Sequence, residues 1–385
     1  MEANSLYQKK YDAFQKAVNR QEGPYVPTAI TNNGGGLFWT GKTAFDVAGD
    51  PEAYAKAITS FLDEMWVDAN VLSGLTTTPR RDKVFPTAEN RLAADGTLTH
   101  LQNPMMKPEE YDQLIENPKA FIANVLLPRK YPYLYESREK AREILKVYAE
   151  EQVNGFVGQM NYTHKYLTRV YGVYNCVNMR CMINTPLDHL FDYFRGFRGT
   201  LTDLRRQPDK VQAALDSIWE YQNAPKTAVP YDASLGFPFQ PCHIPAYLSP
   251  KQFRELYWPY EKKLIEWVSS AGGKIFLVME GRWEKIMDCF LEVPKDSLVL
   301  AVDDDDIFKV HEVLGEHQII CGGLKLADTR LKKFDAIKDG IKRVIDTCAP
   351  GGGFIFSTDK GFLTPGDVNP TLIECFNFAH EYSIK

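Results

Sequence analysis

Three polar residues stand where the sequence could build an acid–base or metal site: Glu280, Asp303 and His243. Glu280 ends the segment "KIFLVME", whose apolar run suits a strand that is covered on both faces. A carboxyl group in such surroundings has a raised pKa and can donate a proton as a general acid. The alternative is a metal site in which these three side chains supply oxygen and nitrogen ligands. A third reading makes Glu280 a structural residue that pairs with Arg282 or with a neighbouring helix N-cap.

Asp303 is predicted at a strand end, and His243 in a loop on the long connection after the strand predicted at 227–234. Asp303 is the first of four aspartates after the apolar run "LVLAV", and the third or fourth of them is expected to cap the following helix. His243 lies in "FQPCHIPAY", before a helix that Ser249 and Pro250 begin. Residues that follow parallel strands share one edge of the sheet, and α/β barrels carry their active sites at that edge.

Several aromatic side chains and one further histidine are predicted near the same strand ends. Aromatic faces are the expected lining for a flat aryl ligand. The candidates for binding such a substrate are Phe38, Trp39, Tyr162, His164, Phe237, Phe239 and Trp283. The segment "TNNGGGLFW" (31–39) lacks the glycine spacing of a nucleotide-binding loop, and we expect a mobile loop there.

Short apolar runs alternate with helical patterns along the chain, as in repeated strand–helix units. The sequence predicts eight strands, at residues 25–31, 69–74, 155–163, 227–234, 274–281, 297–303, 318–324 and 353–359. This number favours a (β/α)8 TIM barrel, formed by residues 1–385 as a single domain, over an open doubly wound sheet. The pattern adds an N-terminal helical extension and, within 75–135, a hairpin and a helix inserted after the second strand.

Composition narrows the classes of partner. The chain has 385 residues, 44% of them hydrophobic, and a formal net charge of −5. No basic stripe is present to hold phosphates, so nucleic acid is not expected as a partner. No run of eighteen apolar residues and no signal peptide is present, so we expect a cytoplasmic protein without a membrane span. The seven scattered cysteines indicate neither a disulfide framework nor a CxxC metal site.

Four segments together resemble the uroporphyrinogen decarboxylase superfamily. They are "PLDHLFDYFRGFRGTLTDLRRQPDKVQAALD" (186–216), "YLSPKQFRELYWPYEKKLI" (247–265), "EVLGEHQIICGGL" (312–324) and "GGGFIFSTDKGFLTPGDVNPTLIECFNFAHEY" (351–382). The resemblance implies a single (β/α)8 barrel, in agreement with the strand pattern. It leaves the reaction open, because the superfamily contains both the decarboxylase and cobalamin-linked methyltransferases.

Two branches of the superfamily need residues that this chain lacks. The porphyrinogen enzymes carry an arginine-rich motif after the first strand and an aspartate after the second, where this chain has "TNNGGGLFWTGKT" (31–43) and "VLSGLTTT" (71–78). The thiol-methylating enzymes carry a His-x-Cys and a later Cys that bind zinc. At those positions this chain has Val278, Glu280 and a residue near Asp359 or Lys360, so a thiolate zinc site is not expected.

The resemblance then implies a methyltransferase that works with a corrinoid (cobalamin) carried by a partner protein. We predict that the chain demethylates a methoxylated aromatic and passes the methyl group to the Co(I) of a separate corrinoid protein. Glu280 would protonate the leaving oxygen, with Asp303 and His243 as further catalytic residues or as ligands of a metal ion. The alternatives are a decarboxylase of a small carboxylated substrate and a non-catalytic corrinoid- or tetrapyrrole-binding barrel. A homodimer is compatible with the sequence.

Overall fold

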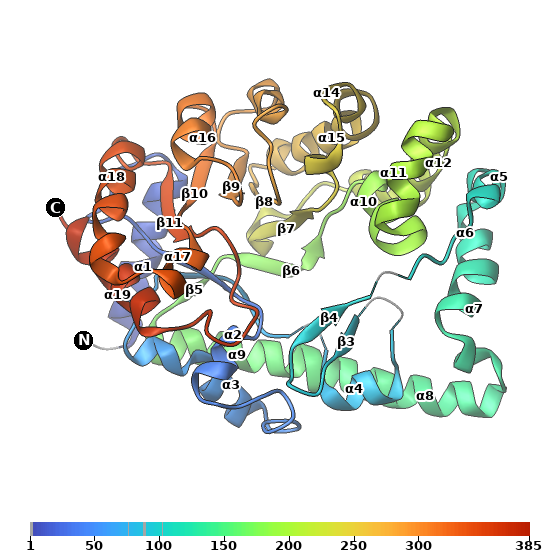
Figure 1. Ribbon diagram of the computed structural model, residues 1–385, viewed down its shortest axis with the longest axis horizontal. Coiled ribbons are helices and arrows are strands. Elements are labelled where there is room, and N and C mark those ends of the chain that lie inside the picture. Colours follow the sequence, from blue (N-terminus) through green and yellow to red (C-terminus); the bar gives the residue numbers. More distant parts are fainter. Residues whose placement is uncertain (1–2, 76, 88–89, 102) are drawn as a thin grey trace.

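A curled sheet of parallel strands forms the centre of the fold (Figure 1). The computed structural model describes residues 3–75, 77–87, 90–101 and 103–385. The strands pair in the orders β1-β2-β5 and β11-β10-β9-β8-β7-β6, and the pairs in both groups are parallel. Their bounds are β1 (Ala29–Asn32), β2 (Ala69–Ser73), β5 (Tyr174–Asn175), β6 (Val177–Met182), β7 (Phe237–Cys242), β8 (Ile275–Met279), β9 (Leu298–Val302), β10 (Ile319–Leu324) and β11 (Phe354–Thr358). The predicted α/β class with a parallel sheet is therefore confirmed.

The two groups of strands adjoin at both of their edges. Cys176 is the single residue between β5 and β6, so the chain runs from one group directly into the other. At the opposite edges, isolated parallel bridges join Thr28 to Phe356 and Asn32 to Phe362. These contacts curl the sheet, which therefore has a concave and a convex face.

The concave face is filled by apolar side chains and by helix α1 (Ala3–Val18). Successive residues of a strand point to opposite faces. In β7, Phe239 belongs to the concave cluster, whereas Cys242 and the following Ile244 belong to the larger core on the convex side. The concave cluster also contains Phe14, Val18, Ala29, Val71, Val177, Phe276, Val299, Ile319 and Ile355. A buried core on both faces explains why most of these strands read as continuous apolar runs.

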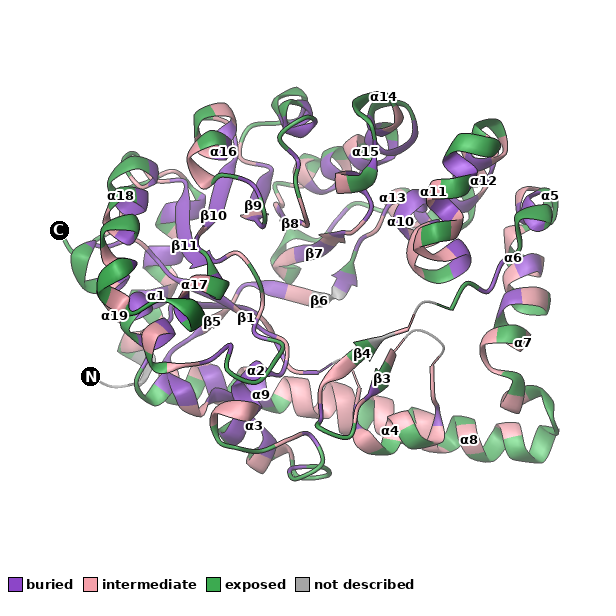
Figure 2. Ribbon diagram, viewed as in Figure 1, coloured by how far each residue is buried: buried purple, intermediate pink, exposed green. Residues whose placement is uncertain are grey.

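Helices cover the convex face, and Figure 2 shows β10 and β11 as mostly buried and much of α8 as exposed. Ser249 begins α14 with a capping box to Gln252, as the sequence predicts. None of the helices in the described ranges combines the length and apolar character needed to cross a bilayer. Besides α1, the helices are α2 (Gly35–Trp39), α3 (Pro51–Thr59), α4 (Pro79–Val84), α5 (Tyr111–Glu116), α6 (Pro118–Phe121), α7 (Leu127–Lys130), α8 (Arg138–Glu150), α9 (Gly158–Tyr171), α10 (Pro186–His189), α11 (Gly196–Arg206), α12 (Pro208–Ile218), α13 (Ala224–Thr227), α14 (Pro250–Gln252), α15 (Trp258–Ser270), α16 (Ile307–Leu314), α17 (Leu326–Leu331), α18 (Lys338–Cys348) and α19 (Pro370–Tyr382).

The segment after β2 contains a hairpin and several helices. Strand β3 (Asn90–Leu92) pairs antiparallel with β4 (Leu98–His100), which confirms the hairpin predicted within 75–135. Buried Arg195 ties this insertion to the rest of the fold. Its Nη1 donates to the carbonyl of Met106 at 2.6 Å, and its Nε pairs with Asp203 Oδ2 at 2.6 Å.

Two of the predicted strands are wrong. Residues 155–163 belong to one helical stretch that runs through α8, the π-helical segment η5 (Glu151–Val157) and α9, so Gly155 and Gly158 lie inside a helix and do not end a strand. Residues 227–234 contain the end of α13, a loop and the start of the 3-10 turn η8 (Ala233–Leu235). The strands at these places in the fold are β5–β6 and β7. Proline lacks a backbone donor and is unusual inside a sheet, so Pro238 and Pro241 hide β7 from a propensity argument.

The expected mobile loop at 31–39 is also wrong. Gly34, Gly35 and Gly36 lead into α2, and each is needed for close packing. Gly34 has a positive φ of 110°, and a Cβ on Gly36 would collide with the carbonyl of Ile58. Asn32 accepts from the N–H of Gly36 at 3.1 Å and fixes the turn further. The glycines therefore hold a tight turn between β1 and α2.

Candidate active site

His243 lies between two carboxylates at the C-terminal edge of the sheet. Asp192 contacts Nδ1 at 2.9 Å with both of its oxygens, and Glu280 Oε1 lies 3.3 Å from Nε2. The pairing register explains the second contact, because Cys242 in β7 is opposite Met279 in β8, and His243 and Glu280 are the next residues. Asp192 comes from the π-helical segment η6 (Leu190–Arg195), which follows α10.

The two carboxylates determine the charge of the ring. Burial opposes the charged form of His243, but the hydrogen bonds to Asp192 and Glu280 outweigh it and raise its pKa to about 11. His243 is therefore an imidazolium at neutral pH. The side chains of His243 and Glu280 keep 35% and 40% of their surface exposed, so a small molecule can reach the pair from solvent. This arrangement can hold a proton and deliver it to a basic atom beside Glu280.

Asp303 lies at the same edge but contacts the backbone next to Glu280. Its Oδ2 accepts from the N–H of Gly281 at 3.0 Å, and its other oxygen pairs with Lys360. Lys360 also lies 3.2 Å from Asp304. Burial raises the pKa of Asp303, although the Gly281 hydrogen bond and Lys360 act against this shift. The geometry gives Asp303 the role of holding the turn that carries Glu280.

The turn after Glu280 is closely packed. Gly281 has a φ of +76°, and a Cβ at this position would lie 2.6 Å from the Cβ of Ala246. Asp305 accepts from the N–H groups of Trp283 at 2.7 Å and Glu284 at 3.1 Å. The segments after β7, β8 and β9 therefore hold one another.

Capping by the aspartate run is confirmed at one position. Asp306 accepts from the N–H of Phe308 and is the N-cap of α16. The third aspartate, Asp305, instead accepts from the backbone after β8. Asp306 therefore caps a helix, whereas Asp305 stabilises a turn.

The three candidate metal ligands do not form a ligand set. In the described part of the chain, no group of three His, Cys, Asp or Glu side chains is arranged to hold a metal ion. Both ring nitrogens of His243 face carboxylates, and Asp303 is paired with Lys360. The donor set is thus that of a hydrogen-bonded acid–base group.

Three of the aromatic candidates do not fit a substrate-binding role. Trp283 is fully buried and stacks on Phe290, with ring centroids 5.5 Å apart. Phe237 lies at the N-terminal end of β7, away from His243, and packs on Phe14 of α1. Phe239 is buried in the concave cluster. Proximity to a strand end in sequence did not reveal which end or which face these rings occupy.

The remaining candidates lie on helices. Tyr162 and His164 are part of α9, and burial lowers the pKa of His164 to about 4, which keeps its ring neutral. Phe38 and Trp39 are part of α2, and Trp39 packs against the main core. Phe38 and Tyr162 are therefore at least partly accessible to solvent, but their positions do not indicate a ligand.

A different group of aromatic residues lies next to the His243 group in the chain. Phe191 precedes Asp192, Phe197 follows it on α11, and Tyr247 lies four residues after His243 in the 3-10 turn η9 (Pro245–Tyr247). The rings of Phe191 and Phe197 are 5.7 Å apart, and those of Phe197 and Tyr247 are 4.9 Å apart. Tyr247 is exposed. The sequence reasoning missed this group because none of its members directly follows a predicted strand.

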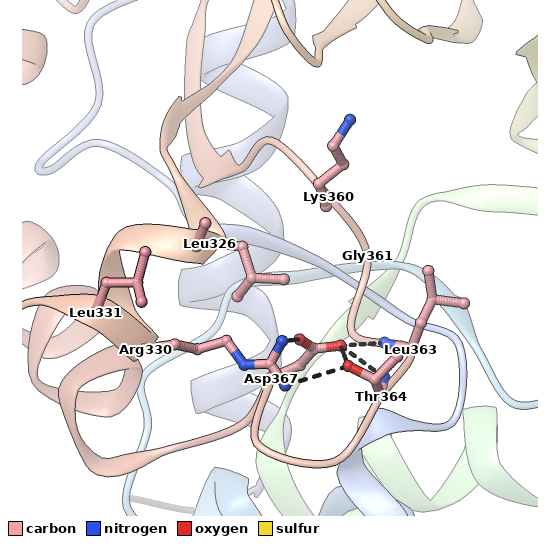
Figure 3. Close-up of a pocket in the computed structure, with 9 residues that line it drawn as sticks. Leu326, Arg330, Leu331, Lys360, Gly361, Leu363, Thr364 and Asp367 are labelled. Carbon is pink, nitrogen blue, oxygen red and sulfur yellow. Dashed lines mark hydrogen bonds and ion pairs between the residues drawn. The ribbon is translucent and has the colours of Figure 1, made fainter. Parts of the chain in front are cut away.

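Two cavities lie along the same edge, one of them lined by Asp303 itself. One, of about 550 Å³, is lined by residues of α17 and of the segment after β11, including Arg330, Lys360 and Asp367 (Figure 3). Figure 3 shows Arg330 directed at Asp367 and Lys360 directed away from that pair. Another, of about 690 Å³, is lined by Asp303 to Asp306, Lys325 and residues of α18. Their charged groups are mostly paired with one another, so we place the candidate site at His243.

Asp192 is the functional residue that sequence reasoning missed. It lies within a helical segment, where a carboxylate usually faces solvent. The available signal was the spacing of Asp188 and Asp192 in "PLDHLFDYF", because residues four apart share one face of a helix. Two acidic residues on one face of a short helical segment were therefore the signal that could have marked the site.

Comparison with known proteins supports the family and the fold. The family model described as uroporphyrinogen decarboxylase (URO-D) matches residues 143–382, which is more than half of the chain. No curated protein matches the chain. The fold is similar to that of a solved structure, a methyltransferase from Methanosarcina mazei, with a TM-score of 0.55 over 96% of this chain and 97% of that one. The two sequences are 16% identical, so the likeness concerns the fold.

Proposed function

The chain belongs to the uroporphyrinogen decarboxylase family, and on that premise we propose that it is a corrinoid-dependent methyltransferase that demethylates a methoxylated aromatic compound. The observation that carries the proposal is the charged His243 ring held between Asp192 and Glu280. The solved methyltransferase of the same fold supports the reaction class.

The proposed reaction needs a proton at the leaving oxygen. When the methyl–oxygen bond of an aryl methyl ether breaks, the electron pair stays on oxygen, and the resulting phenol has a pKa of about 10. His243 holds a proton with a pKa of about 11, which nearly matches that of the phenol. Glu280 lies on the Nε2 side of the ring and would pass this proton to the oxygen and keep the oxygen in place. The corrinoid of a partner protein would supply the nucleophile that accepts the methyl group.

Access to the site is consistent with a cofactor carried by another protein. His243 and Glu280 are partly exposed at the edge of the sheet, so a bound methoxy group there would face solvent and an incoming partner. The edge-to-face rings of Phe191, Phe197 and Tyr247, which are close to Asp192 and His243 in the chain, support an aryl substrate, because aromatic faces are a favourable lining for a flat ring.

The test is a reconstituted methyl transfer. The purified protein is mixed with 2-methoxyphenol and a reduced corrinoid protein, and the cobalt spectrum and the released catechol are followed together. The proposal expects both signals to appear at the same rate. Release of CO2 from a carboxylated substrate with an unchanged cobalt spectrum would contradict it and favour a decarboxylase, and binding of a corrinoid or tetrapyrrole without turnover would favour a binding protein.

We also infer that the curled sheet closes as an eight-stranded (β/α)8 barrel, with α1 as the N-terminal extension and the segment after β2 as the insertion. Counting β5 and β6 as one strand interrupted at Cys176 gives eight parallel strands in the described ranges. The bridges from Thr28 to Phe356 and from Asn32 to Phe362 support closure between β1 and β11. In such a barrel, Glu280 and His243 end the fifth and fourth strands at the edge where active sites lie.

A further inference from the structure

A column of buried polar groups lies behind His243, on the convex side of β7. Strand alternation turns every second residue of this segment toward the helices. Each of these residues meets a polar partner: Gln240 Nε2 donates to Glu261 Oε2 at 2.5 Å, Cys242 hydrogen-bonds with Tyr257, and the N–H of Ile244 donates to Asp188 Oδ1 at 3.4 Å. Because the surrounding core is apolar, burying these polar groups costs free energy, and a role for them would explain why they are there.

Among these buried polar groups, Asp188 is linked most directly to His243, because it accepts from the N–H of the next residue, Ile244. Its Oδ2 accepts from Tyr257 Oη at 2.8 Å and from Thr185 Oγ1 at 2.9 Å. Asp188, Tyr257 and Thr185 are each fully buried. A buried carboxyl group is costly unless it is fully hydrogen-bonded, and here donors from three different elements satisfy it.

Asp188 and Asp192 act on consecutive residues of one segment. They lie four residues apart in the continuous helical stretch of α10 and η6, so they share a face. Asp192 holds the ring of His243, and Asp188 holds the N–H of the next residue, Ile244. The helical stretch and the segment after β7 are thereby joined at two adjacent points.

We infer that Asp188 is a positioning residue: with Tyr257 and Thr185 it fixes the backbone at His243–Ile244 so that the imidazole stays between Asp192 and Glu280. Its consequence for methyl transfer rests on the proposed function, whereas its effect on the ring does not. Removing one donor loosens the segment and disfavours the charged form of Asp188, and both changes make the imidazolium of His243 less stable.

The test compares Tyr257→Phe and Asp188→Asn with the matched control Tyr260→Phe. Tyr260 is buried in the same helical region, but its hydroxyl donates to Asp216 at 2.6 Å, on another helix. The ring of His243 is followed by NMR in ¹⁵N-histidine-labelled protein, with His243→Gln used to assign its signal. Thr185→Val, which removes another donor to the same carboxyl group, decides the question if Asp188→Asn does not fold.

The expected result is a shift of the His243 titration to lower pH by about one unit or more in Tyr257→Phe and in Asp188→Asn, with no shift in Tyr260→Phe. In methyl transfer, kcat should fall by about tenfold or more with KM unchanged, since the donor is misplaced while substrate binding remains. Identical His243 titrations in Tyr257→Phe and the control would overturn the inference. Because the NMR measurement uses no methyl donor, a failure of the proposed function would appear separately, as a wild-type protein that transfers no methyl group.

Discussion

At the scale of single residues, His243 keeps its proton because carboxylates from two different elements face its two nitrogens. Asp192 provides the closer contact, at 2.9 Å against 3.3 Å for Glu280. Asp192→Asn should therefore lower the pKa of His243 from about 11 by about one to three units, the usual effect of losing a neighbouring opposite charge. The pH titration of the ring by NMR measures this. Asp216→Asn, which removes a carboxylate bound to Tyr260, is the control, and an equal titration in both variants would contradict the assignment of Asp192.

The sequence predicted part of this site for a physical reason. Glu280 was predicted at a strand end, because an apolar run that stops at a polar residue is visible in a sequence. His243 was predicted only as a loop residue on the same side, because the prolines hid the strand β7 that it follows. Asp192 reaches the site from a helix, and only the packing of α10–η6 against β7 brings it there. Trp283 and Phe237 were predicted to bind substrate because they lie near strand ends in the sequence, but Trp283 is buried and Phe237 packs on Phe14. Nearness in sequence does not give the direction of a side chain.

At the scale of elements, the buried contact between β7 and α15 should make stability depend on pH. Burial raises the pKa of Glu261 from 4.5 to about 8, so the folded state binds this proton more tightly than the unfolded state does. Between pH 4.5 and 8 the free energy of unfolding should therefore fall as the pH rises, by up to about 1.4 kcal/mol per unit from this group. The loss begins at the unfolded pKa and is complete above the folded one.

Glu261→Gln should remove this dependence. The new amide can accept from Gln240 Nε2 and donate to Gln240 Oε1, which has no hydrogen-bond partner within the described part of the chain. Urea unfolding of both proteins at pH 5, 7 and 8.5 measures the difference between their free energies of unfolding. We expect the free energy of unfolding of the variant to rise relative to that of the wild type as the pH rises. A constant difference across these values would show that Glu261 does not titrate in this range.

The attachment of the insertion gives a second prediction at this scale. Asp203 is buried, pairs with Arg195 and accepts from Tyr111 Oη at 3.0 Å. Asp203→Ala leaves a buried guanidinium unpaired and should lower the free energy of unfolding by about 3–5 kcal/mol. Asp112→Ala is a matched control, since Asp112 joins the same insertion to Lys210 of α12 by an exposed ion pair and should cost less than about 1 kcal/mol. If chemical denaturation gave equal losses in the free energy of unfolding for Asp203→Ala and Asp112→Ala, burial would not explain the strength of the Arg195–Asp203 pair.

The wrong predictions of elements share one cause. Glycines in 155–163 and prolines in β7 are strong local signals, and in both segments long-range packing overrides them. The long helix from α8 to α9 packs on α3 and α1, and β7 is completed by β6 and β8 on either side. Those partners are distant in sequence, so a local pattern could not supply them.

At the scale of the whole molecule, the fold class followed from repeated alternation. The apolar runs at β8, β9, β10 and β11 alternate with helices, and a parallel sheet buried on both faces produces that pattern. The course of the insertion after β2 did not follow from the sequence, because its attachment depends on single buried contacts such as that of Arg195. The family match over residues 143–382 covers the half of the chain that holds Asp192, His243 and Glu280.

The whole molecule acts, in the proposed function, to present the Glu280–His243 pair to the leaving oxygen. Glu280→Gln should leave binding of a methoxyarene nearly intact and slow methyl transfer by about 10²- to 10⁴-fold. Glu284→Gln, an exposed carboxyl group four residues further along, is the matched control and should retain the wild-type rate.

The most direct test of proton delivery compares an unactivated methoxyarene with a nitro-substituted one in wild type and Glu280→Gln. A better leaving group needs less protonation, so the slowing caused by Glu280→Gln should shrink on the nitro-substituted substrate. Single-turnover rates of cobalt methylation for the four combinations give the ratio. A clearly smaller loss on the nitro compound is the predicted result, and an equal loss on both substrates, or full activity of the variant on the unactivated one, would contradict proton delivery by this pair.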